Sequence, residues 1–252
     1  MSSSPRLAQC TWTEARERFK AACVAIVPSG ANEAAGPHLP TSADTIMAEE
    51  MCVRGAAELQ RRGVDSLVLP TLPYGASYAS YPFPGTIVLT PTAIQAVMTD
   101  VGRSVERHGL SHLLLASAHL EPGHLSALQA AGYILERETR LKVSVLDLRE
   151  PRWAGRLSEE FRSGARHAGS YATSLVLAAR PDLVHMDVAR TLAPVWINLL
   201  DAIQKGARTF DQVGSDLAYF GEPAKASAEE GERLFQALGT IIADAVEELL
   251  RR

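Results

Sequence analysis

The chain has 252 residues, 46% of them hydrophobic, which is enough to bury one substantial core. Its formal net charge of −4 at pH 7 gives no indication of binding to nucleic acid or to an anionic membrane. Three cysteines without CxxC spacing, Cys10, Cys23 and Cys52, exclude a zinc–thiolate site and fit a reducing compartment. Since the first residues lack the apolar core of a signal peptide and no apolar stretch approaches about 18 residues, we expect a cytoplasmic protein.

Apolar runs and periodic segments alternate along the chain. We expect residues 1–8 to be a disordered leader and residues 9–252 to form one domain. The predicted strands cover residues 22–28, 65–70, 112–117 and 141–147. The predicted helices cover residues 13–20, 43–62, 91–108, 123–140, 171–179 and 228–251. Residues 181–227 are irregular and are expected at one edge of the sheet. Strands alternating with helices at this spacing predict a single three-layer α/β/α domain with a mostly parallel sheet flanked by helices.

The most informative segment follows the first predicted strand. Residues 32–40 (NEAAGPHLP) place Glu33 and His38 in a turn rich in glycine and proline, and Asp44 follows shortly after. Such a turn is not a helix interior. Enzymes of the α/β class place metal ligands and acid/base groups on the loops that leave parallel strands. Taken alone, the segment fits a polar surface loop equally well.

Two further loops carry polar side chains in similar places. After the predicted strand 112–117, His119 and Glu121 are two residues apart, so in an extended segment both point the same way and can converge on one site. Residues 166–174 (RHAGSYATS) form a loop that places His167 just before an apolar helix. The alternative for His119 is a loop histidine satisfied by its neighbours, and the alternative for His167 is capping of the helix.

In this order, the segments resemble the creatininase family, the creatinine amidohydrolase-like proteins. Typical members carry Glu-Gln-His-Gly-Pro-His-Leu-Pro with a following Asp, then Tyr-Gly-x-Ser with Phe-Pro-Gly-Thr, an Asn-Gly-His loop and His-Ala-Gly-x-x-Glu-Thr-Ser. The matching segments here are residues 33–40 (EAAGPHLP) with Asp44, 74–77 (YGAS) with 83–86 (FPGT), 117–119 (SAH), 167–174 (HAGSYATS) and, as a weak echo, 221–231. Five ordered motifs are far more specific than any single one.

The resemblance implies divalent metal ions at the carboxyl ends of the strands. One ion falls on Glu33, Asp44 and His119, and two carboxylates with one imidazole suit zinc, manganese or iron. The second ion of the family uses a histidine where this chain has Ala35, together with Asp44 and the acid at Glu121. Because a methyl group does not ligate a metal, we expect one tightly held ion and a second site that is empty or weak.

Other polar positions of the family are also replaced. The glutamate of the last motif is Ala172 here, the Glu-His that many members carry before Phe-Pro-Gly-Thr is Ala79-Ser80, and the Asn-Gly before the loop histidine is Ser117-Ala118. The resemblance places all of these positions around one pocket. They indicate a site rebuilt for a different substrate or reaction, or a site that has lost catalysis.

The resemblance implies a reaction at a cyclic amide or a related C–N bond of a small molecule, in the direction of hydrolysis or of ring closure. The metal makes a bound water acidic and polarises the carbonyl. Glu121 would accept the proton of the water, and His167 would protonate the leaving nitrogen. The alternative from another class is a non-catalytic binding or assembly protein that kept the fold.

The surroundings of the pocket are expected to supply substrate contacts. The candidates are His38, Tyr78, Ser80, Tyr171 and Trp153. For His38 the alternative is support of its own loop, since prolines flank it closely, and His124 is expected at a surface or a helix end. The resemblance also implies a homo-oligomer, a hexamer in the family. The apolar residues 193–200 (APVWINLL) would be an unusual surface for a monomer, and they fit an ordinary buried helix equally well.

Overall fold

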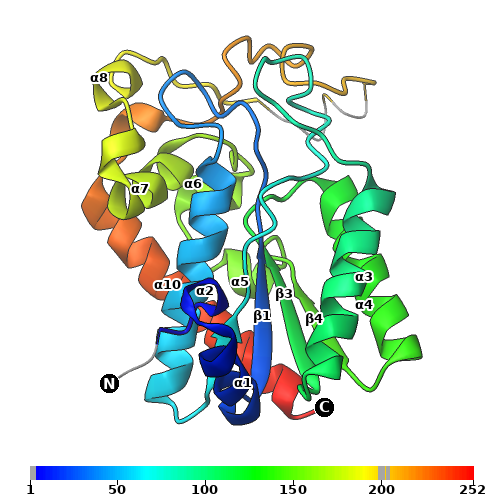
Figure 1. Ribbon diagram of the computed structural model, residues 1–252. Coiled ribbons are helices and arrows are strands. Elements are labelled where there is room, and N and C mark those ends of the chain that lie inside the picture. Colours follow the sequence, from blue (N-terminus) through cyan, green and yellow to red (C-terminus); the bar gives the residue numbers. More distant parts are fainter. Residues whose placement is uncertain (1–3, 198–201, 203–204) are drawn as a thin grey trace.

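Four parallel strands form the sheet at the centre of the molecule (Figure 1). The computed structural model describes residues 4–197, 202 and 205–252. The strands are β1 Val24–Ser29, β2 Ser66–Val68, β3 His112–Ser117 and β4 Lys142–Leu146. They lie in the order β2-β1-β3-β4, and each neighbouring pair is parallel. The fold is therefore the three-layer α/β/α type expected from the sequence.

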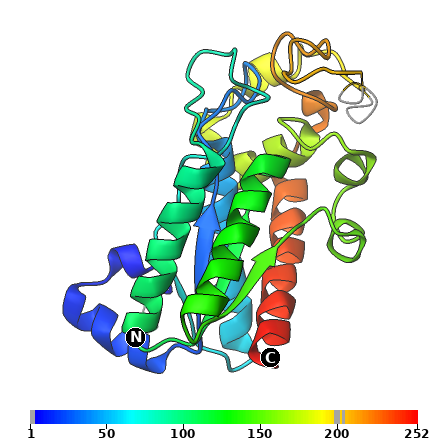
Figure 2. The ribbon, with the colours of Figure 1, turned by 90° about the vertical axis from the view of Figure 1, so that its right-hand side faces the viewer.

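Helices cover both faces of the sheet (Figures 1 and 2). On one face lie α2 Ala43–Arg61, α7 Ser170–Ala179 and α10 Ala228–Leu250, and on the other lie α3 Pro91–Arg107 and α4 Pro122–Glu138. α1 Trp12–Ala21 precedes β1. The short elements are η1 Leu7–Gln9, α5 Pro151–Ala154, α6 Glu159–Ser163, η2 Pro181–Leu183, α8 Met186–Ala189 and η3 Pro223–Lys225. Within the described part of the chain, no helix combines the length and apolar character needed to cross a membrane.

The central strand β1 is buried along its whole length. Val24 and Ile26 pack into the apolar cluster beneath α2 and α10, whereas Ala25 and Val27 pack into the cluster on the side of α3 and α4. Burying a side chain of the size of valine or isoleucine stabilises the fold by roughly 1.5–3 kcal/mol. A nearly continuous apolar run, rather than strict alternation, is therefore what a parallel strand between two helical layers requires.

Two glycines allow close contacts of the segment after β1, one with the start of α2 and one with the segment above the sheet. A Cβ on Gly30 would lie 2.6 Å from the Cα of Thr45, so a larger residue would push the strand end and the helix apart. Gly36 has a φ of +69°, which favours glycine, and its N–H donates to the Ala218 carbonyl at 2.9 Å. The loop that carries Glu33 is thereby held beside the first turn of α2.

The predicted elements agree with the structure within a few residues, but the predicted leader needs correction. The N–H of Val68 donates to the Pro5 carbonyl at 2.9 Å, and Arg6 Nε lies 3.0 Å from Glu49 Oε1. Residues 4–8 therefore pack against β2 and α2 instead of forming a disordered leader, whereas residues 1–3 lie outside the described residues.

The position expected for residues 181–227 is also wrong, although their described part is irregular as expected. The described residues of this segment, yellow to orange in Figure 1, lie over the carboxyl ends of the strands rather than at an edge of the sheet. Val195 pairs with Gly221 in an antiparallel bridge, and Trp196 is 55% exposed, so residues 193–197 are not part of a buried helix. Residues 198–200 of the same apolar run lie outside the described residues. The irregular segment forms part of a cavity above the sheet.

Candidate metal centre and active site

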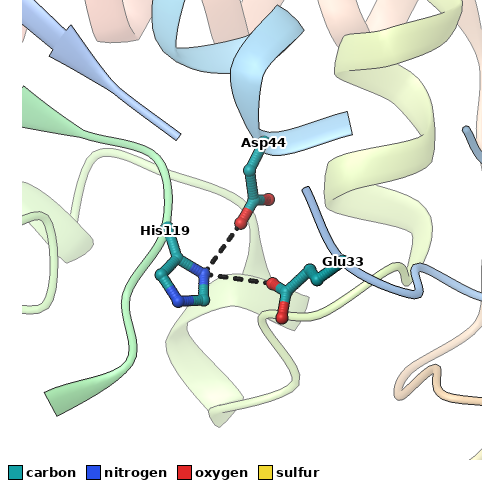
Figure 3. Close-up of side chains that lie close together, drawn as sticks. All are labelled: Glu33, Asp44 and His119. Carbon is teal, nitrogen blue, oxygen red and sulfur yellow. Dashed lines mark hydrogen bonds and ion pairs between the residues drawn. The ribbon is translucent and has the colours of Figure 1, made fainter. Parts of the chain in front are cut away.

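Three side chains converge just beyond the ends of β1 and β3 (Figure 3). Glu33 lies on the loop after β1, Asp44 lies in the first turn of α2, and His119 lies on the loop after β3. Ser29 at the end of β1 pairs with Ser117 at the end of β3, so both loops leave the sheet side by side. The fold therefore brings together the three residues predicted as ligands of one ion.

The geometry of the three donors fits a small divalent ion. His119 Nδ1 lies 3.0 Å from Glu33 Oε1 and 2.9 Å from Asp44 Oδ2, and one ligand atom from each residue lies within 4.8 Å of the others. Metal bonds of about 2.1 Å place neighbouring ligand atoms roughly 3 Å apart. Glu33 and His119 are buried and Asp44 is partly buried. Among the described residues, this is the one group of three such side chains that meets the spacing of a metal site.

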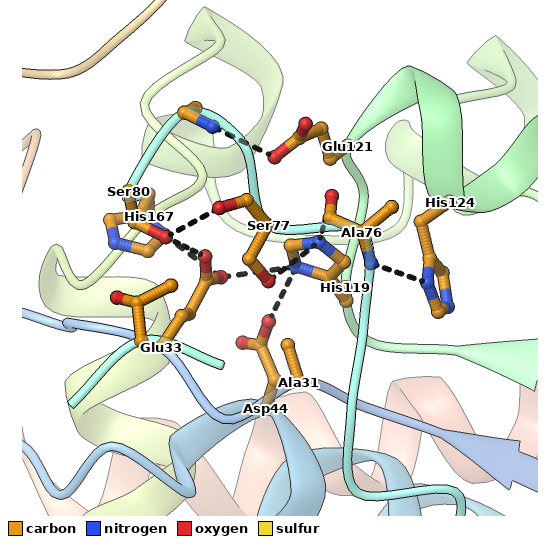
Figure 4. Close-up of polar contacts among 12 residues, drawn as sticks. Ala31, Glu33, Asp44, Ala76, Ser77, Ser80, His119, Glu121, His124 and His167 are labelled. Atoms are coloured by element: carbon orange, nitrogen blue, oxygen red, sulfur yellow. Dashed lines mark hydrogen bonds and ion pairs between the residues drawn. The ribbon is translucent and has the colours of Figure 1, made fainter. Parts of the chain in front are cut away.

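The ring of His119 is oriented by its second nitrogen (Figure 4). Nε2 lies 3.3 Å from the Ala76 carbonyl and 3.4 Å from Ser77 Oγ. Because a carbonyl oxygen only accepts, Nε2 carries a proton and Nδ1 points at the carboxylates. This is the outer contact that fixes the tautomer of a metal-binding histidine. A Cβ on Gly75 would lie 2.9 Å from His119 Cδ2. Glycine at this position therefore lets the backbone before Ala76 approach the imidazole ring.

The positive charge of His119 and the negative charges of the carboxylates stabilise one another. Burial opposes a charge on His119, but Glu33 and Asp44 outweigh it and raise the pKa of His119 well above its ordinary value. Burial would likewise raise the pKa of Glu33, but His119 and His167 hold it well below its usual range. Burial raises the pKa of Asp44. A divalent ion bound by His119 Nδ1 and both carboxylates would take the position of the Nδ1 proton. Metal binding and protonation of His119 therefore exclude each other.

His167 lies beside this centre and is fixed by its own contacts. Its Nε2 lies 2.8 Å from the Ala34 carbonyl, and its Nδ1 lies 3.7 Å from Glu33 Oε1. The next residue, Ala168, has a φ of 53°, a left-handed conformation that costs energy for a residue other than glycine. The N-cap of α7 is Gly169, which makes no side-chain cap, so the capping alternative for His167 is wrong.

Glu121 faces the same space from the end of the β3 loop. Its two carboxylate oxygens accept hydrogen bonds from the N–H groups of Tyr78 and Ala79, at 3.1 and 3.3 Å. Burial, the largest effect, raises the pKa of Glu121 from its ordinary value, while the charge of His119 opposes the increase. Glu121 therefore combines a structural role, holding the Tyr78–Ala79 turn, with a position suited to proton transfer.

These residues lie in one cavity of about 930 Å³. All five residues predicted as metal ligands or catalytic groups line it, namely Glu33, Asp44, His119, Glu121 and His167. Apolar walls come from the segment above the sheet and include Ile197, Phe210 and Phe220. Four arginines that the sequence interpretation did not single out also line the cavity: Arg149, Arg162, Arg166 and Arg208.

The residues predicted as substrate contacts lie elsewhere. His38 is fully buried and its Nε2 lies 2.8 Å from Thr173 Oγ1, so it supports its own loop, as the alternative had it. Tyr171 and Trp153 are buried outside the cavity, Tyr171 against Phe161.

Two other predicted contacts also need correction. Ser80 is buried and donates its hydroxyl to Glu33 Oε2 at 2.6 Å, so it orients a candidate ligand rather than a substrate. Tyr78 is exposed and does not line the cavity. Apart from Arg166, which directly precedes the motif at 167–174, the arginines and the apolar residues of the walls come from segments without a recognised motif.

A further histidine beside the candidate metal centre is His124, which was expected at a surface or helix end. It is fully buried in α4, its Nε2 lies 2.9 Å from Ser29 Oγ, and its Nδ1 accepts from the Ala76 N–H at 3.4 Å. Burial, helped by the charge of His119, lowers the pKa of His124 to about 3. Its spacing from Leu128 and Ala131 places it on the buried face of the helix, which is a signal that the sequence contains.

A parallel sheet whose carboxyl end carries two carboxylates and one imidazole, with a histidine and a glutamate beside them, is an arrangement typical of metal-dependent hydrolases. The family described as creatininase, creatinine amidohydrolase, matches residues 8–246. The chain therefore belongs to the creatininase family, and the resemblance drawn from its motifs is confirmed.

Two relatives indicate the breadth of this family. The chain is 31% identical over 227 residues to a mycofactocin precursor peptide peptidase of Mycolicibacterium smegmatis, which covers 88% of this chain and 83% of that protein. It is 29% identical over 266 residues to a creatinine amidohydrolase of Pseudomonas putida, covering 98% of both.

Solved creatininase structures share the fold over almost the whole chain. A crystal structure of creatinine amidohydrolase aligns with a TM-score of 0.77 at 28% identity and covers 98% of both chains. Structures described as a manganese creatininase and as a Zn–Zn mutant each align with a TM-score of 0.73 at 27% identity, again over 98% of both chains.

Proposed function

We propose that this protein is a metal-dependent amidohydrolase that cleaves the C–N bond of an amide in a small molecule or a short peptide. The observation that carries the proposal is the buried centre of Glu33, Asp44 and His119 at the base of the cavity, with His167 beside it. The peptide-cleaving relative widens the range of substrates beyond the cyclic amides expected from the motifs.

The residues of the site have separate roles in metal binding, proton acceptance and proton donation. When bound to Glu33, Asp44 and His119, a zinc, manganese or iron ion supplies Lewis acidity and makes water acidic near neutral pH. Glu121, whose pKa is raised by burial, is placed to accept a proton in the cavity and to return it. His167 keeps Nε2–H on the Ala34 carbonyl, so its Nδ1 is the atom placed to donate a proton to the leaving nitrogen.

One ion, rather than two, is the metal content we propose. Ala35 is buried in an apolar cluster at the position where the family has a histidine ligand, and it offers no donor. The oxygens of Glu121 are engaged by the N–H groups of Tyr78 and Ala79. These contacts support a second site that is weak or absent.

Ring closure is the reverse of the same reaction and uses the same groups. The apolar side chains of Ile197, Phe210 and Phe220 line part of the cavity, and a wall of this kind would limit the competition of water with a condensation. A cyclic amide of a small molecule is therefore included among the proposed substrates. By family resemblance we also propose a homo-oligomer, and the 55% exposed Trp196 is consistent with a contact between subunits.

A non-catalytic binding protein is the second candidate, because the family's polar positions are alanine here at Ala35, Ala79 and Ala172. One experiment distinguishes the hydrolase from the binding protein. Purified protein is dialysed, its metal content is measured, and the zinc-, manganese- or iron-loaded protein is assayed with a cyclic imide, a dipeptide and an N-formyl amine. We expect about one ion per chain and hydrolysis of at least one compound. A folded protein that retains no ion and cleaves none of them would support the binding role.

A further inference from the structure

The arginines of the cavity are the feature that the proposed reaction does not use. Arg149, the pair Arg162 and Arg166, and Arg208 come from three segments and line the same space as the candidate metal centre. Cleavage of a neutral amide requires none of them. Four guanidinium groups are a strong concentration of positive charge in a protein whose net charge is −4.

Three of these arginines form no ion pair with a carboxylate of the described residues. Arg149 makes several contacts with Asp147, the shortest at 2.8 Å. By contrast, Arg162 and Arg166 donate to the backbone carbonyls of Leu157 and Phe161. In the part of the chain that the structure describes, no carboxylate oxygen lies within 4.0 Å of the side-chain nitrogens of Arg162, Arg166 or Arg208.

The acidic residues of the cavity do not compensate for this charge. A divalent ion would balance Glu33 and Asp44, which leaves Glu121 against three guanidinium groups. Arg166 is also partly buried, and its desolvation, together with the charge of Arg149, lowers its pKa from the usual value, while the charge of Asp147 opposes this decrease. A partly desolvated cation without a carboxylate at ion-pair distance gains from an anionic ligand.

The arginines also lie close to the reacting groups along the chain. Arg166 directly precedes His167, and Arg149 Nη1 lies 3.4 Å from the carbonyl of Leu120, the residue between His119 and Glu121. An anion held here would therefore belong to the same small substrate as the bond that is cleaved, and would not require a long peptide.

We infer that the substrate of this protein carries an anionic oxygen group, a carboxylate or a phosphate, that binds Arg166 together with Arg162 and Arg208. The inference deepens the proposed function by naming the substrate class. Its first part, recognition of the anion, does not depend on cleavage. A neutral cyclic amide would leave the three charges unpaired and would bind weakly.

The test compares matched ligands by calorimetry with zinc-loaded protein. N-Acetylglycine and its uncharged analogue N-acetylglycinamide differ in the carboxylate alone, and inorganic phosphate represents the other source of anionic oxygen. We expect one of the anions to bind about tenfold or more tightly than the amide, the usual advantage of a charge-assisted contact. The anion that binds more tightly shows whether the substrate carries a carboxylate or a phosphate. Equal binding of acid, phosphate and amide would overturn the inference.

Variants then locate the binding. Arg166→Gln, and independently the exposed Arg208→Gln, should reduce the preference for the anion several-fold, whereas Arg107→Gln at the far end of α3 should leave it unchanged. An anion held by the ion alone would keep its preference in both cavity variants. If the preference survives in both of them, the inference is wrong. If the anion binds but no amide is cleaved, the proposed hydrolase fails while the anion site remains.

Discussion

His119 and His124 pack edge to face, with ring centroids 5.0 Å apart and an interplanar angle of 76°. One ring belongs to the candidate metal centre and the other is buried in α4. Because the pKa of His124 is held at about 3, chiefly by burial, its ring stays neutral beside the charged groups of the site. Its hydrogen bonds to Ser29 and Ala76 connect the end of β1 with the backbone that orients His119.

Replacing His124 should therefore weaken metal binding without touching a ligand. His124→Phe keeps an aromatic ring but loses the contacts to Ser29 and Ala76. We expect the Kd for zinc, measured by competition with a chromogenic chelator, to rise about 10- to 100-fold, the usual effect of removing an outer contact of a metal ligand. His185→Gln, at an exposed position, is the matched control and should have no effect. An unchanged Kd in a folded His124→Phe protein would mean that His124 only fills space.

Metal stoichiometry tests the role assigned to Ala35. After extensive dialysis we expect about one ion per chain in the unmodified protein and almost none in His119→Ala. Ala35→His should restore a second donor set and bring the content toward two ions. Because Ala35 is packed in the apolar core, the larger ring should also destabilise the protein by about 1–3 kcal/mol. Two tightly held ions in the unmodified protein would contradict the prediction.

The fold and the metal centre could be predicted from the sequence because their signals are local. The run of apolar residues in β1 reflects burial on both faces, and the loops after β1 and β3 carry the ligands in a fixed order. The cavity walls could not be predicted in this way. Tyr171 was expected to contact substrate, but it shares the buried face of α7 with Leu175, one helical turn away. Arg166 and Phe210 both line the cavity, but they lie in irregular segments. Such segments have no hydrophobic periodicity from which their position could be predicted.

Acid should destabilise the protein through its buried neutral histidines. Burial, the largest effect, lowers the pKa of His38 to about 4, compared with about 6.5 in the unfolded chain. Between these values the unfolded state binds a proton that the folded state does not, so the stabilisation present above about pH 6.5 is lost as the pH falls toward 4. Urea unfolding at pH 7.5 and pH 5 should show a smaller loss of stability in His38→Gln than in the unmodified protein. Equal losses in both proteins would assign the acid sensitivity to other groups.

His167 is expected to act on protons and not on the metal. His167→Ala should lower turnover by roughly 10²–10⁴, the usual contribution of a positioned acid or base, because Nδ1 is the proposed proton donor to the leaving nitrogen. Metal content and melting temperature should stay close to those of the unmodified protein, since His167 is not one of the three ligands. His167→Gln is the informative control: its amide can still donate to the Ala34 carbonyl but does not titrate. We therefore expect it to be as slow as His167→Ala, because an amide does not act as a general acid. Full activity of His167→Gln on the same substrate would make His167 a purely structural residue and leave Glu121 as the group that moves the proton.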